Sequence, residues 1–296
     1  MISVVINTLN ESARLADAIS SVKKFADEIV VIDMESDDRS VEIAKDLGAK
    51  VFTHKRMDYV ELARNFGISK ASGDWILILD PDEQLCPSLS VKLKEEVKNN
   101  TADYFRIPRK NIVFNKWLKY SRWWPDYNIR FFKKGSVEWS EMIHSVPITT
   151  GRGADVDERE DNAIIHHHYD SISQYLERLN RYTNAQSAER VKKGEKFSWK
   201  DLLIKPSNEF LSRYFLGQGY KDGAHGLALS LLQGFSELIV FLKIWEINKF
   251  EKQNTPLSNV LTTLKIIEKD FHFWEADSMV KENGGLVYRI RRKLKV

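Results

Sequence analysis

The residues Ser72 to Leu85 decide the fold, and they read S-G-D-W-I-L-I-L-D-P-D-E-Q-L. The apolar run at 75–79 is too short for a typical helix, and the turn residues Ser72-Gly73-Asp74 come directly before it. This pattern predicts a buried strand, parallel to its neighbours and covered by helices on both faces. Pro81 disfavours helical backbone at the residue before it, so the strand should end in a stiff, extended turn.

Three carboxylates follow this strand, those of Asp80, Asp82 and Glu83. Open α/β sheets bind ligands outside the carboxyl ends of their strands. Like charges this close repel one another, and a hard divalent cation such as Mg²⁺ or Mn²⁺ would relieve the repulsion. The residues alone leave two interpretations open, a metal-dependent ligand site and a solvated acidic turn.

Strands and helices alternate before this stretch. The ranges 2–8, 28–33 and 50–53 are typical of strands, and helical periodicity connects them and continues over 57–71. The alternation predicts an α/β fold with a doubly wound, mostly parallel sheet. The first strand ends near Thr8, Asn10 and Glu11 and the second ends at Asp33, so these side chains should converge with Asp80 along one rim. The glycine-rich motifs of dinucleotide dehydrogenases and P-loop enzymes are absent from the sequence.

The second half of the chain is different in character. An aromatic stretch at 117–132 suits sugar rings or a hydrophobic lid, and three consecutive histidines stand at 166–168. Helical periodicity then covers 171–193, a long region from Pro206 to Phe250, and 257–269. We therefore expect a catalytic domain at residues 1–170 and a helical region at 171–296.

Composition excludes several classes of protein. The 296 residues are 43% hydrophobic and carry a net charge of only +3, which gives no overall indication of nucleic-acid binding. The single cysteine, Cys86, allows no internal disulfide and suits a reducing cytoplasm. The N-terminus enters a strand directly, which predicts no signal peptide, and Glu237 makes the apolar stretch 223–242 a poor membrane span.

The C-terminal end is basic. Six Lys or Arg residues and one acid lie between Lys281 and Val296. Together with the helices before it, this end predicts a cytoplasmic protein held peripherally at the inner face of the cell membrane by anionic lipid. Packing on the catalytic domain or self-association as a homo-oligomer is the alternative use of these helices.

Four motifs in order resemble the family 2 glycosyltransferases of the GT-A fold: N-T-L-N-E (7–11), V-V-I-D with S-D-D-R-S (30–40), A-R-N-F-G (63–67), and S-G-D-W-I-L-I-L-D-P-D-E (72–83), which is similar to the D-x-D motif. Later segments resemble a bacterial subgroup that includes lipopolysaccharide core β-glucosyltransferases: W-W-P-D-Y-N-I-R-F-F-K-K-G (123–135), H-H-H-Y (166–169), R-Y-T-N-A (181–185) and Y-K-D-G-A-H-G-L (220–227).

The resemblance implies a GT-A, Rossmann-like catalytic domain that transfers a sugar, a hexose as in that subgroup, with inversion. The donor would be a nucleotide-sugar, with a UDP-sugar favoured, and the acceptor a hydroxyl of a cell-surface glycan or lipopolysaccharide core. The residues carried over as nucleotide contacts are Thr8, Asn10, Glu11, Asp33, Arg64 and Asp80. Asp80, Asp82 and His144 are carried over as contacts of a Mg²⁺ or Mn²⁺ ion, which would neutralise charge on the leaving diphosphate.

One departure concerns the general base. The subgroup often has an acid where this chain has Ser145. An inverting transfer needs a carboxylate within hydrogen-bond reach of the acceptor hydroxyl. Of the nearby acids, Glu141 and Asp126 are the preferred candidates, with Glu138 as a further one.

Three other functions stay open at this point. One is transfer to a polyprenyl-phosphate-linked acceptor, and another is a catalytically weak homologue that binds glycans or acts as a scaffold. A nucleotidyltransferase is disfavoured because N-T-L-N-E-S-A-R (7–14) is not the glycine-rich, basic loop that such enzymes usually carry after their first strand.

Overall fold

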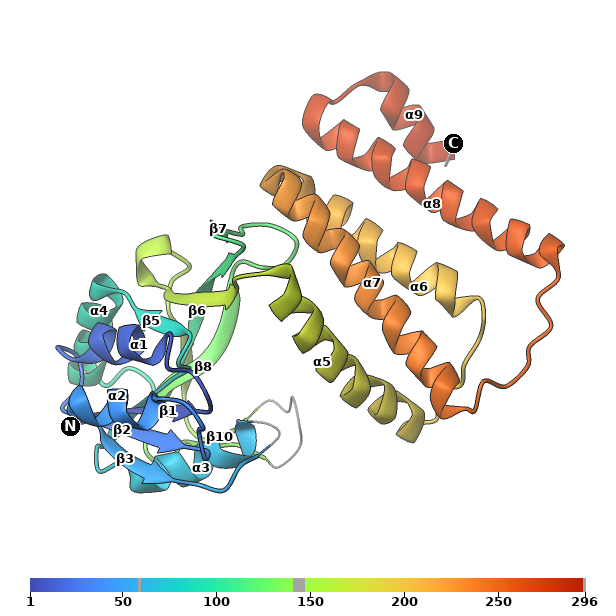
Figure 1. Ribbon diagram of the computed structural model, residues 1–296. Helices are drawn as coiled ribbons and strands as arrows, with labels where there is room; N and C mark the ends of the chain where they lie inside the picture. The colour runs from blue at the N-terminus through green and yellow to red at the C-terminus, as the bar shows by residue number, and fades with distance from the viewer. Residues whose placement is uncertain (58–59, 141–146, 295–296) are drawn as a thin grey trace. The chain divides into compact units, whose positions relative to one another are not determined.

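The computed structural model describes residues 1–57, 60–140 and 147–294, and it consists of two compact units (Figure 1). Unit 1 contains Met1–Ile112 and Trp124–His168, and unit 2 contains Val113–Trp123 and Tyr169–Val296. The chain therefore crosses between the units more than once. The last crossing follows His168, two residues before the boundary expected at 170. The hydrophobic periodicity of the sequence did not predict that residues 113–123 belong to unit 2.

Unit 1 is built on one sheet with the strand order β3-β2-β1-β4-β8-β6-β12-β5. The first four strands are parallel, with Thr8 beside Asp33 and Ile6 beside Leu79. β8 pairs antiparallel with both β4 and β6, and β12 pairs antiparallel with β5. The strand bounds are β1 Ile2–Thr8, β2 Glu28–Asp33, β3 Lys50–Thr53, β4 Trp75–Leu79, β5 Glu83–Leu85, β6 Tyr104–Val113, β8 Asp126–Lys133, β11 Gly153–Asp155 and β12 Ile164–Tyr169, with a separate pair of β9 Val137–Glu138 and β10 Ile148–Thr149.

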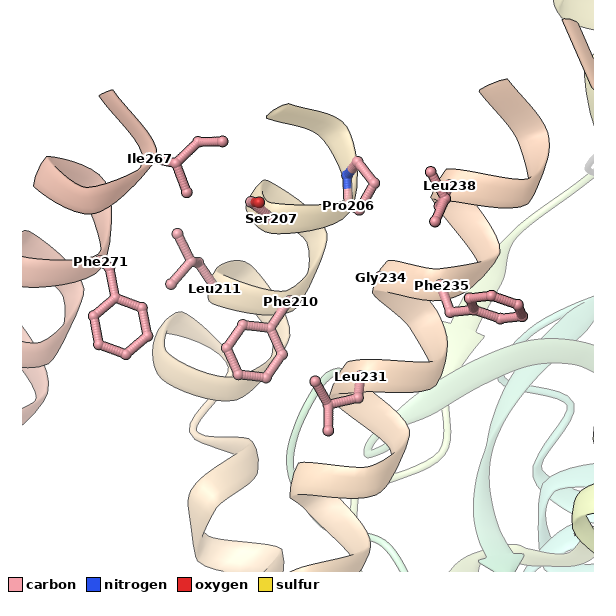
Figure 2. Close-up of a pocket in the computed structure, with 10 residues that line it drawn as sticks. All are labelled: Pro206, Ser207, Phe210, Leu211, Leu231, Gly234, Phe235, Leu238, Ile267 and Phe271. Carbon is pink, nitrogen blue, oxygen red and sulfur yellow. The ribbon is translucent and has the colours of Figure 1, made fainter. Parts of the chain in front are cut away.

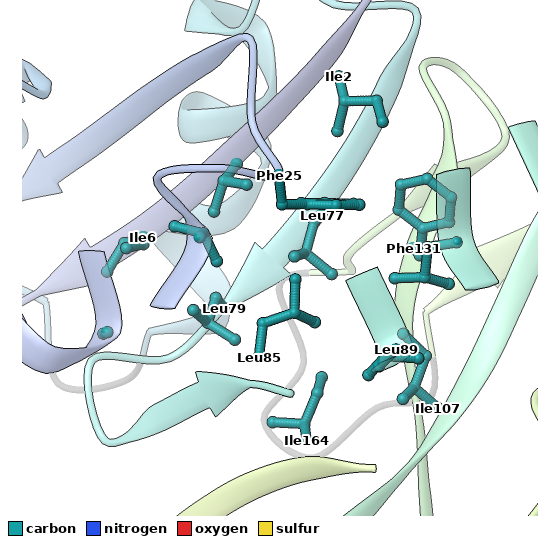
Figure 3. Close-up of a cluster of buried hydrophobic side chains, with 14 of the residues drawn as sticks. Ile2, Ile6, Phe25, Leu77, Leu79, Leu85, Leu89, Ile107, Phe131 and Ile164 are labelled. Carbon is teal, nitrogen blue, oxygen red and sulfur yellow. The ribbon is translucent and has the colours of Figure 1, made fainter. Parts of the chain in front are cut away.

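Helices cover both faces of this sheet, which explains why β4 is apolar without alternation. All five of its residues are buried. Leu77 and Leu79 belong to a cluster that includes Leu15 of α1, and the cluster is shown in Figure 3. Ile76 and Ile78 face the opposite way and pack with Ile68 of α3. The helices of unit 1 are α1 Leu15–Val22, α2 Ser40–Asp46, α3 Glu61–Lys70 and α4 Pro87–Asn99, with a 3₁₀ turn at Glu160–Asn162. The predicted α/β, Rossmann-like fold of GT-A type with a helical C-terminal extension is confirmed.

Unit 2 is mainly helical. Its helices are α5 Ile172–Lys192, α6 Asp201–Leu211, α7 Ala224–Ile247, α8 Leu257–Asn283 and α9 Leu286–Leu294, and it also holds the short strand β7 Lys116–Trp117. Two buried clusters form its interior, one around Tyr175 and Leu229 and the other around Val240 and Phe241. Asp222 accepts hydrogen bonds from the backbone N–H groups of Lys119 and Tyr120, which fixes the segment 113–123 to this unit.

The long helical region expected from Pro206 to Phe250 is divided into separate helices in the structure. α6 begins before Pro206 and contains it, and the helical path is interrupted between residues 212 and 223 by a π turn and a 3₁₀ turn. The chain changes direction at Gln218 and Gly223, whose φ values are 57° and 64°. Gly226 allows the resulting turn to pack closely, because a Cβ atom there would lie 1.8 Å from the carbonyl oxygen of Gly219. The helix expected at 257–269 is longer than predicted and continues to Asn283.

By length and composition alone, α7 is long and apolar enough to cross a membrane. One third of its most apolar stretch is buried inside the protein, and core helices of soluble proteins can meet the same criterion. The feature therefore gives weak evidence for a span.

Candidate active site

The loops that follow β1 and β2 are fastened to each other by side chains. Asn10 has a left-handed backbone with a φ of 57°. Its Oδ1 accepts a hydrogen bond from the N–H of Asp37 at 2.7 Å, and its own N–H donates to Ser36 Oγ at 2.9 Å. The N–H of Glu11 donates to Ser40 Oγ at 3.0 Å. These bonds fix the loop backbones at the carboxyl edge of the parallel strands.

Polar atoms without partners lie at the end of β1. Thr8 Oγ1 and both polar side-chain atoms of Asn7 are buried, and none has a hydrogen-bond partner among the described residues. Asp33 lies beside Thr8 on the next strand and is 4% exposed. Its carboxylate oxygens each accept from the N–H of Ser36 at a long 3.3 Å. Buried polar groups are normally paired, so this edge has hydrogen-bonding capacity suited to a ligand.

The A-R-N-F-G motif in α3 places Arg64 against the central acid. A Cβ atom on Gly67 would lie 2.7 Å from Val5 Cγ1, so glycine lets α3 approach the sheet closely. Asn65 exchanges hydrogen bonds with the backbone N–H and carbonyl of Trp139. The guanidinium of Arg64 lies over the Trp139 ring, and its Nη2 donates to Asp80 Oδ1 at 2.9 Å.

Asp80 is held by two arginines. Arg130 of β8 donates to its second oxygen at 2.5 Å, and Arg64 donates to the first. Burial by itself would raise the pKa of Asp80, but Arg130 and then Arg64 outweigh burial and hold this pKa well below its usual range. The repulsion that we expected among the acids is therefore relieved at Asp80 by these guanidinium groups.

Glu83 is wholly buried in the same network. Its Oε1 accepts from Arg130 at 2.7 Å and from Arg109 at 3.2 Å. Its Oε2 accepts from the backbone N–H of Asp80 at 2.9 Å. Glu83 thus fixes the turn after β4 from the inside, and Asp80 and Asp82 are the two acids of the motif with partly exposed side chains.

Asp82 lies against the three histidines of β12. Its carbonyl oxygen accepts from the N–H of His167 at 2.9 Å, and its Oδ2 lies 3.6 Å from His166 Nε2. His166 Nδ1 is 2.6 Å from Asn111 Oδ1, and Asn111 Nδ2 is 3.1 Å from an Asp126 oxygen. Because the amide N–H₂ must donate to the carboxylate, Asn111 Oδ1 accepts from Nδ1–H of His166. The Nε2 atom of His166 lies 3.2 Å from Nδ1 of His168 and 3.6 Å from Oδ2 of Asp82.

Asp126, a predicted general base, is also bound to Arg109, with oxygen–nitrogen distances of 2.6 and 2.9 Å. Burial alone would raise its pKa, but Arg109 and Asn111 lower the pKa below its ordinary value. The other predicted base, Glu141, and the predicted metal contact, His144, lie outside the described residues, as does Ser145.

The described residues contain no group of three or more His, Cys, Asp or Glu side chains arranged as a metal cluster. Mg²⁺ typically binds through one or two carboxylates together with waters and substrate phosphates. Asp82 suits such a role best, because its carboxylate lies on the turn and both oxygens of Asp80 already accept from arginines. The residues present therefore fit a cation that shares its ligands with a bound diphosphate.

The structure brings together Thr8, Asn10, Glu11, Asp33, Arg64, Asp80 and Asp82 at the rim of one unit. Sequence reasoning missed four partners of the acids, namely Arg109, Asn111, Arg130 and His166. Arg130 gave a usable signal, because a charged residue between Ile129 and Phe131 in an apolar strand implies a buried counter-ion. The pairing of Asn111 with His166 joins two distant segments and has no local signal.

Comparison with known proteins identifies the family. The model of glycosyl transferase family 2 matches residues 3–154, which is about half of the chain. An uncharacterized glycosyltransferase of Rickettsia typhi is 31% identical over 259 residues, covering 83% of this chain and 87% of the relative. A dolichol-phosphate mannosyltransferase of Pyrococcus furiosus is 33% identical over 108 residues, covering 34% of this chain and 31% of the relative.

Among solved structures, glucosyl-3-phosphoglycerate synthase of Mycobacterium tuberculosis in complex with Mn²⁺, UDP and glucosyl-3-phosphoglycerate is 22% identical, with a TM-score of 0.33. The match covers 38% of this chain and 44% of that chain. The alignment with the Rickettsia relative is longer than unit 1, so the similarity reaches into the helical unit. By the family model and this long alignment, the chain belongs to glycosyl transferase family 2.

Proposed function

We propose that this family 2 glycosyltransferase transfers a sugar from a UDP-sugar to a hydroxyl of a cell-surface glycan. The observation that carries the proposal is the pair of side chains Thr8, whose buried Oγ1 has no hydrogen-bond partner among the described residues, and Asp33 beside it. They lie at the carboxyl edge of parallel strands, where a nucleotide would supply the missing partner. The carboxylate of Asp33 can accept a hydrogen bond from the imide N–H of uracil.

The remaining rim residues suit the rest of the donor. The backbone of Asn10 and Glu11 is fixed by hydrogen bonds, so this loop can hold the nucleoside without being reordered. Asp80, kept anionic by Arg64 and Arg130, can accept ribose hydroxyl groups. Asp82, with His144 as a further ligand, would hold a Mg²⁺ or Mn²⁺ ion, which when bound neutralises charge on the leaving diphosphate.

Inversion of the sugar requires a base on the face opposite the diphosphate. We propose Glu141 for this role and keep Asp126 as the second candidate. The ion pair with Arg109 and the lowered pKa make the Asp126 carboxylate a weaker base at neutral pH. The contacts of Asp126 also suit a positioning role, because Asp126 orients Asn111, and Asn111 in turn orients His166.

The acceptor is proposed to lie at the inner face of the cell membrane, as a lipopolysaccharide core or another glycolipid. α9 supports this placement, because Leu286, Ile290 and Leu294 form an exposed apolar stripe on a helix that also carries Arg289 and Lys293. Such a helix is typical of binding in the plane of a membrane surface. A polyprenyl-phosphate-linked acceptor is the second candidate, favoured by the partial match to the dolichol-phosphate enzyme.

Thermal unfolding tests the donor site. UDP, GDP, CDP and their glucose conjugates are added with and without Mn²⁺ to wild type, to Asp82→Asn, and to the control Asp155→Asn, whose exposed carboxylate pairs with Arg106. A ligand at a hundredfold its Kd stabilises the native state by about 2.7 kcal/mol. We expect uridine nucleotides to stabilise wild type and the control, and Asp82→Asn to lose the Mn²⁺-dependent part. No stabilisation by any nucleotide would contradict the proposal and favour a scaffold.

A further inference from the structure

An apolar groove crosses three helices of unit 2 (Figure 2). Its volume is about 340 Å³, which lies within the range of small-molecule sites. We call it the α6–α8 groove, and its lining is Pro206, Ser207, Phe210 and Leu211 of α6, Leu231, Gly234, Phe235 and Leu238 of α7, and Ile267 and Phe271 of α8. No charged side chain is among these residues.

A glycine lets two walls of the groove approach each other closely. Gly234 lies between Leu231 and Leu238 on α7, at the helical spacing that puts three residues on one face. A Cβ atom on Gly234 would lie 2.9 Å from the carbonyl oxygen of Pro206, so α7 and α6 approach closely here. The α6 backbone therefore occupies the place that a side chain at Gly234 would take, and Leu231 and Leu238 line the groove on either side of this contact.

The side chains that line the groove favour a hydrocarbon as the ligand. Its one hydroxyl, that of Ser207, already donates to the carbonyl oxygen of Leu203 at 2.7 Å. Large apolar side chains form the rim, with Leu231 54%, Phe235 42% and Phe271 44% exposed. An exposed apolar surface that is gathered in one place typically marks a binding site. A polar ligand would find no unsatisfied side-chain partner in this lining.

The basic residues of α9, the helix after α8, indicate the charge of the headgroup. α9 packs on α8 through Asp277, which pairs with both Lys281 and Arg292. Exposed cations extend along this end of the unit, among them Arg289. Lys281 follows Phe271 by ten residues on α8, a distance of about 15 Å along the helix axis. A chain-like ligand can therefore place hydrocarbon in the groove while its head reaches the basic end.

We propose that the α6–α8 groove binds one hydrocarbon chain of an amphiphile with an anionic headgroup. The inference rests on the proposed glycosyltransferase function in one respect, since the amphiphile is then the lipid part of the acceptor or of the membrane that carries it. The groove would fix the depth of the helical unit in the lipid layer, and α9 would contact the headgroups.

Photo-crosslinking of the full chain tests the proposal. The probe is dodecyl phosphate with a diazirine in its alkyl chain, and labelled residues are mapped by mass spectrometry. We expect labels on the groove residues of α6, α7 and α8, reduced by unlabelled dodecyl phosphate and unchanged by inorganic phosphate. Labels spread over other surfaces, or competition by inorganic phosphate alone, would overturn the proposal.

A matched pair of variants sharpens the test. Leu231→Glu places a carboxylate at the half-exposed rim of the groove, and Leu176→Glu makes the same change at a 42% exposed position on α5. We expect labelling of Leu231→Glu to need at least about tenfold more probe, because a charge in an apolar site is costly to desolvate. Leu176→Glu should label like wild type, and circular dichroism checks that both variants fold.

Light scattering separates the groove from a contact between two copies of the chain. If wild type dimerises, Leu231→Glu is monomeric and the labelling is the same in both, the groove is a dimer surface and the proposal fails. Stabilisation of wild type by UDP and Mn²⁺ reports separately on unit 1. Labelling without nucleotide binding would therefore refute the donor site alone, and nucleotide binding without labelling would refute the groove alone.

Discussion

The two units of this protein differ in which side chains they bury and which they expose. Unit 1 brings charge inside, where Glu83 is wholly buried and Arg130 is 4% exposed, and it pairs each of them. Unit 2 leaves apolar side chains outside, as at Leu231 in the groove and Leu286 on α9. This difference underlies the two proposals made above, a polar ligand at the strand ends of unit 1 and an apolar ligand between the helices of unit 2.

The largest expected effect is at the buried charges of unit 1. Arg130→Met leaves Glu83 and one oxygen of Asp80 without this guanidinium. Breaking a buried ion pair by removing one partner costs about 3–5 kcal/mol, so urea unfolding should show a loss of this size. The control is Arg106→Met, which breaks a bidentate pair with Asp155 on the surface of the same unit and should cost about 0–1 kcal/mol. If both variants lost the same free energy of unfolding, the claim that the buried ion pairs matter more than the exposed pair would be contradicted.

A second effect depends on pH and concerns Glu28 at the start of β2. Burial alone would raise the pKa of Glu28, but hydrogen bonds from Lys50, Ser3 and Ser72 lower it from 4.5 to about 2. A lowered folded-state pKa contributes stability above the unfolded pKa, and this contribution is lost as the pH falls from about 4.5 to 2.

The contribution of Glu28 at neutral pH is about 3 kcal/mol as an order of magnitude. Glu28→Gln should therefore be less stable than wild type at pH 7, and the gap should close toward pH 2 in unfolding experiments. The exposed Glu138→Gln is the matched control and should differ little from wild type at either pH. A gap for Glu28→Gln that stays constant over this range would contradict the assignment.

The smallest effect on stability is expected on α9. Ile290→Glu changes a side chain that is 51% exposed, so the free energy of unfolding should move by no more than about 0.5 kcal/mol. Binding to vesicles that contain phosphatidylglycerol should nevertheless fall, because the apolar stripe is interrupted. Sedimentation with the vesicles measures this loss. Unchanged binding would remove α9 from the membrane-surface proposal.

The sequence was sufficient where the signal is local. The apolar run 75–79 and the acids at 80–83 predicted the central strand and its turn, and the polar strand ends predicted the edge at which polar side chains gather. Contacts between distant segments had no such signal. Arg130 lies 50 residues from Asp80, and Asn111 lies 55 residues from His166. The break between α6 and α7 was also missed, because the left-handed backbone at Gln218 and Gly223 interrupts an otherwise helical pattern.

The central claim is that the carboxyl edge of β1, β2 and β4 binds the donor nucleotide. Hydrogen–deuterium exchange of the full chain, with and without UDP and Mn²⁺, tests it most directly. We predict slower exchange at residues 8–12, 33–40 and 80–83, and unchanged exchange in α6 and α7. Protection confined to unit 2, or no protection at a UDP concentration that saturates binding, would contradict the account.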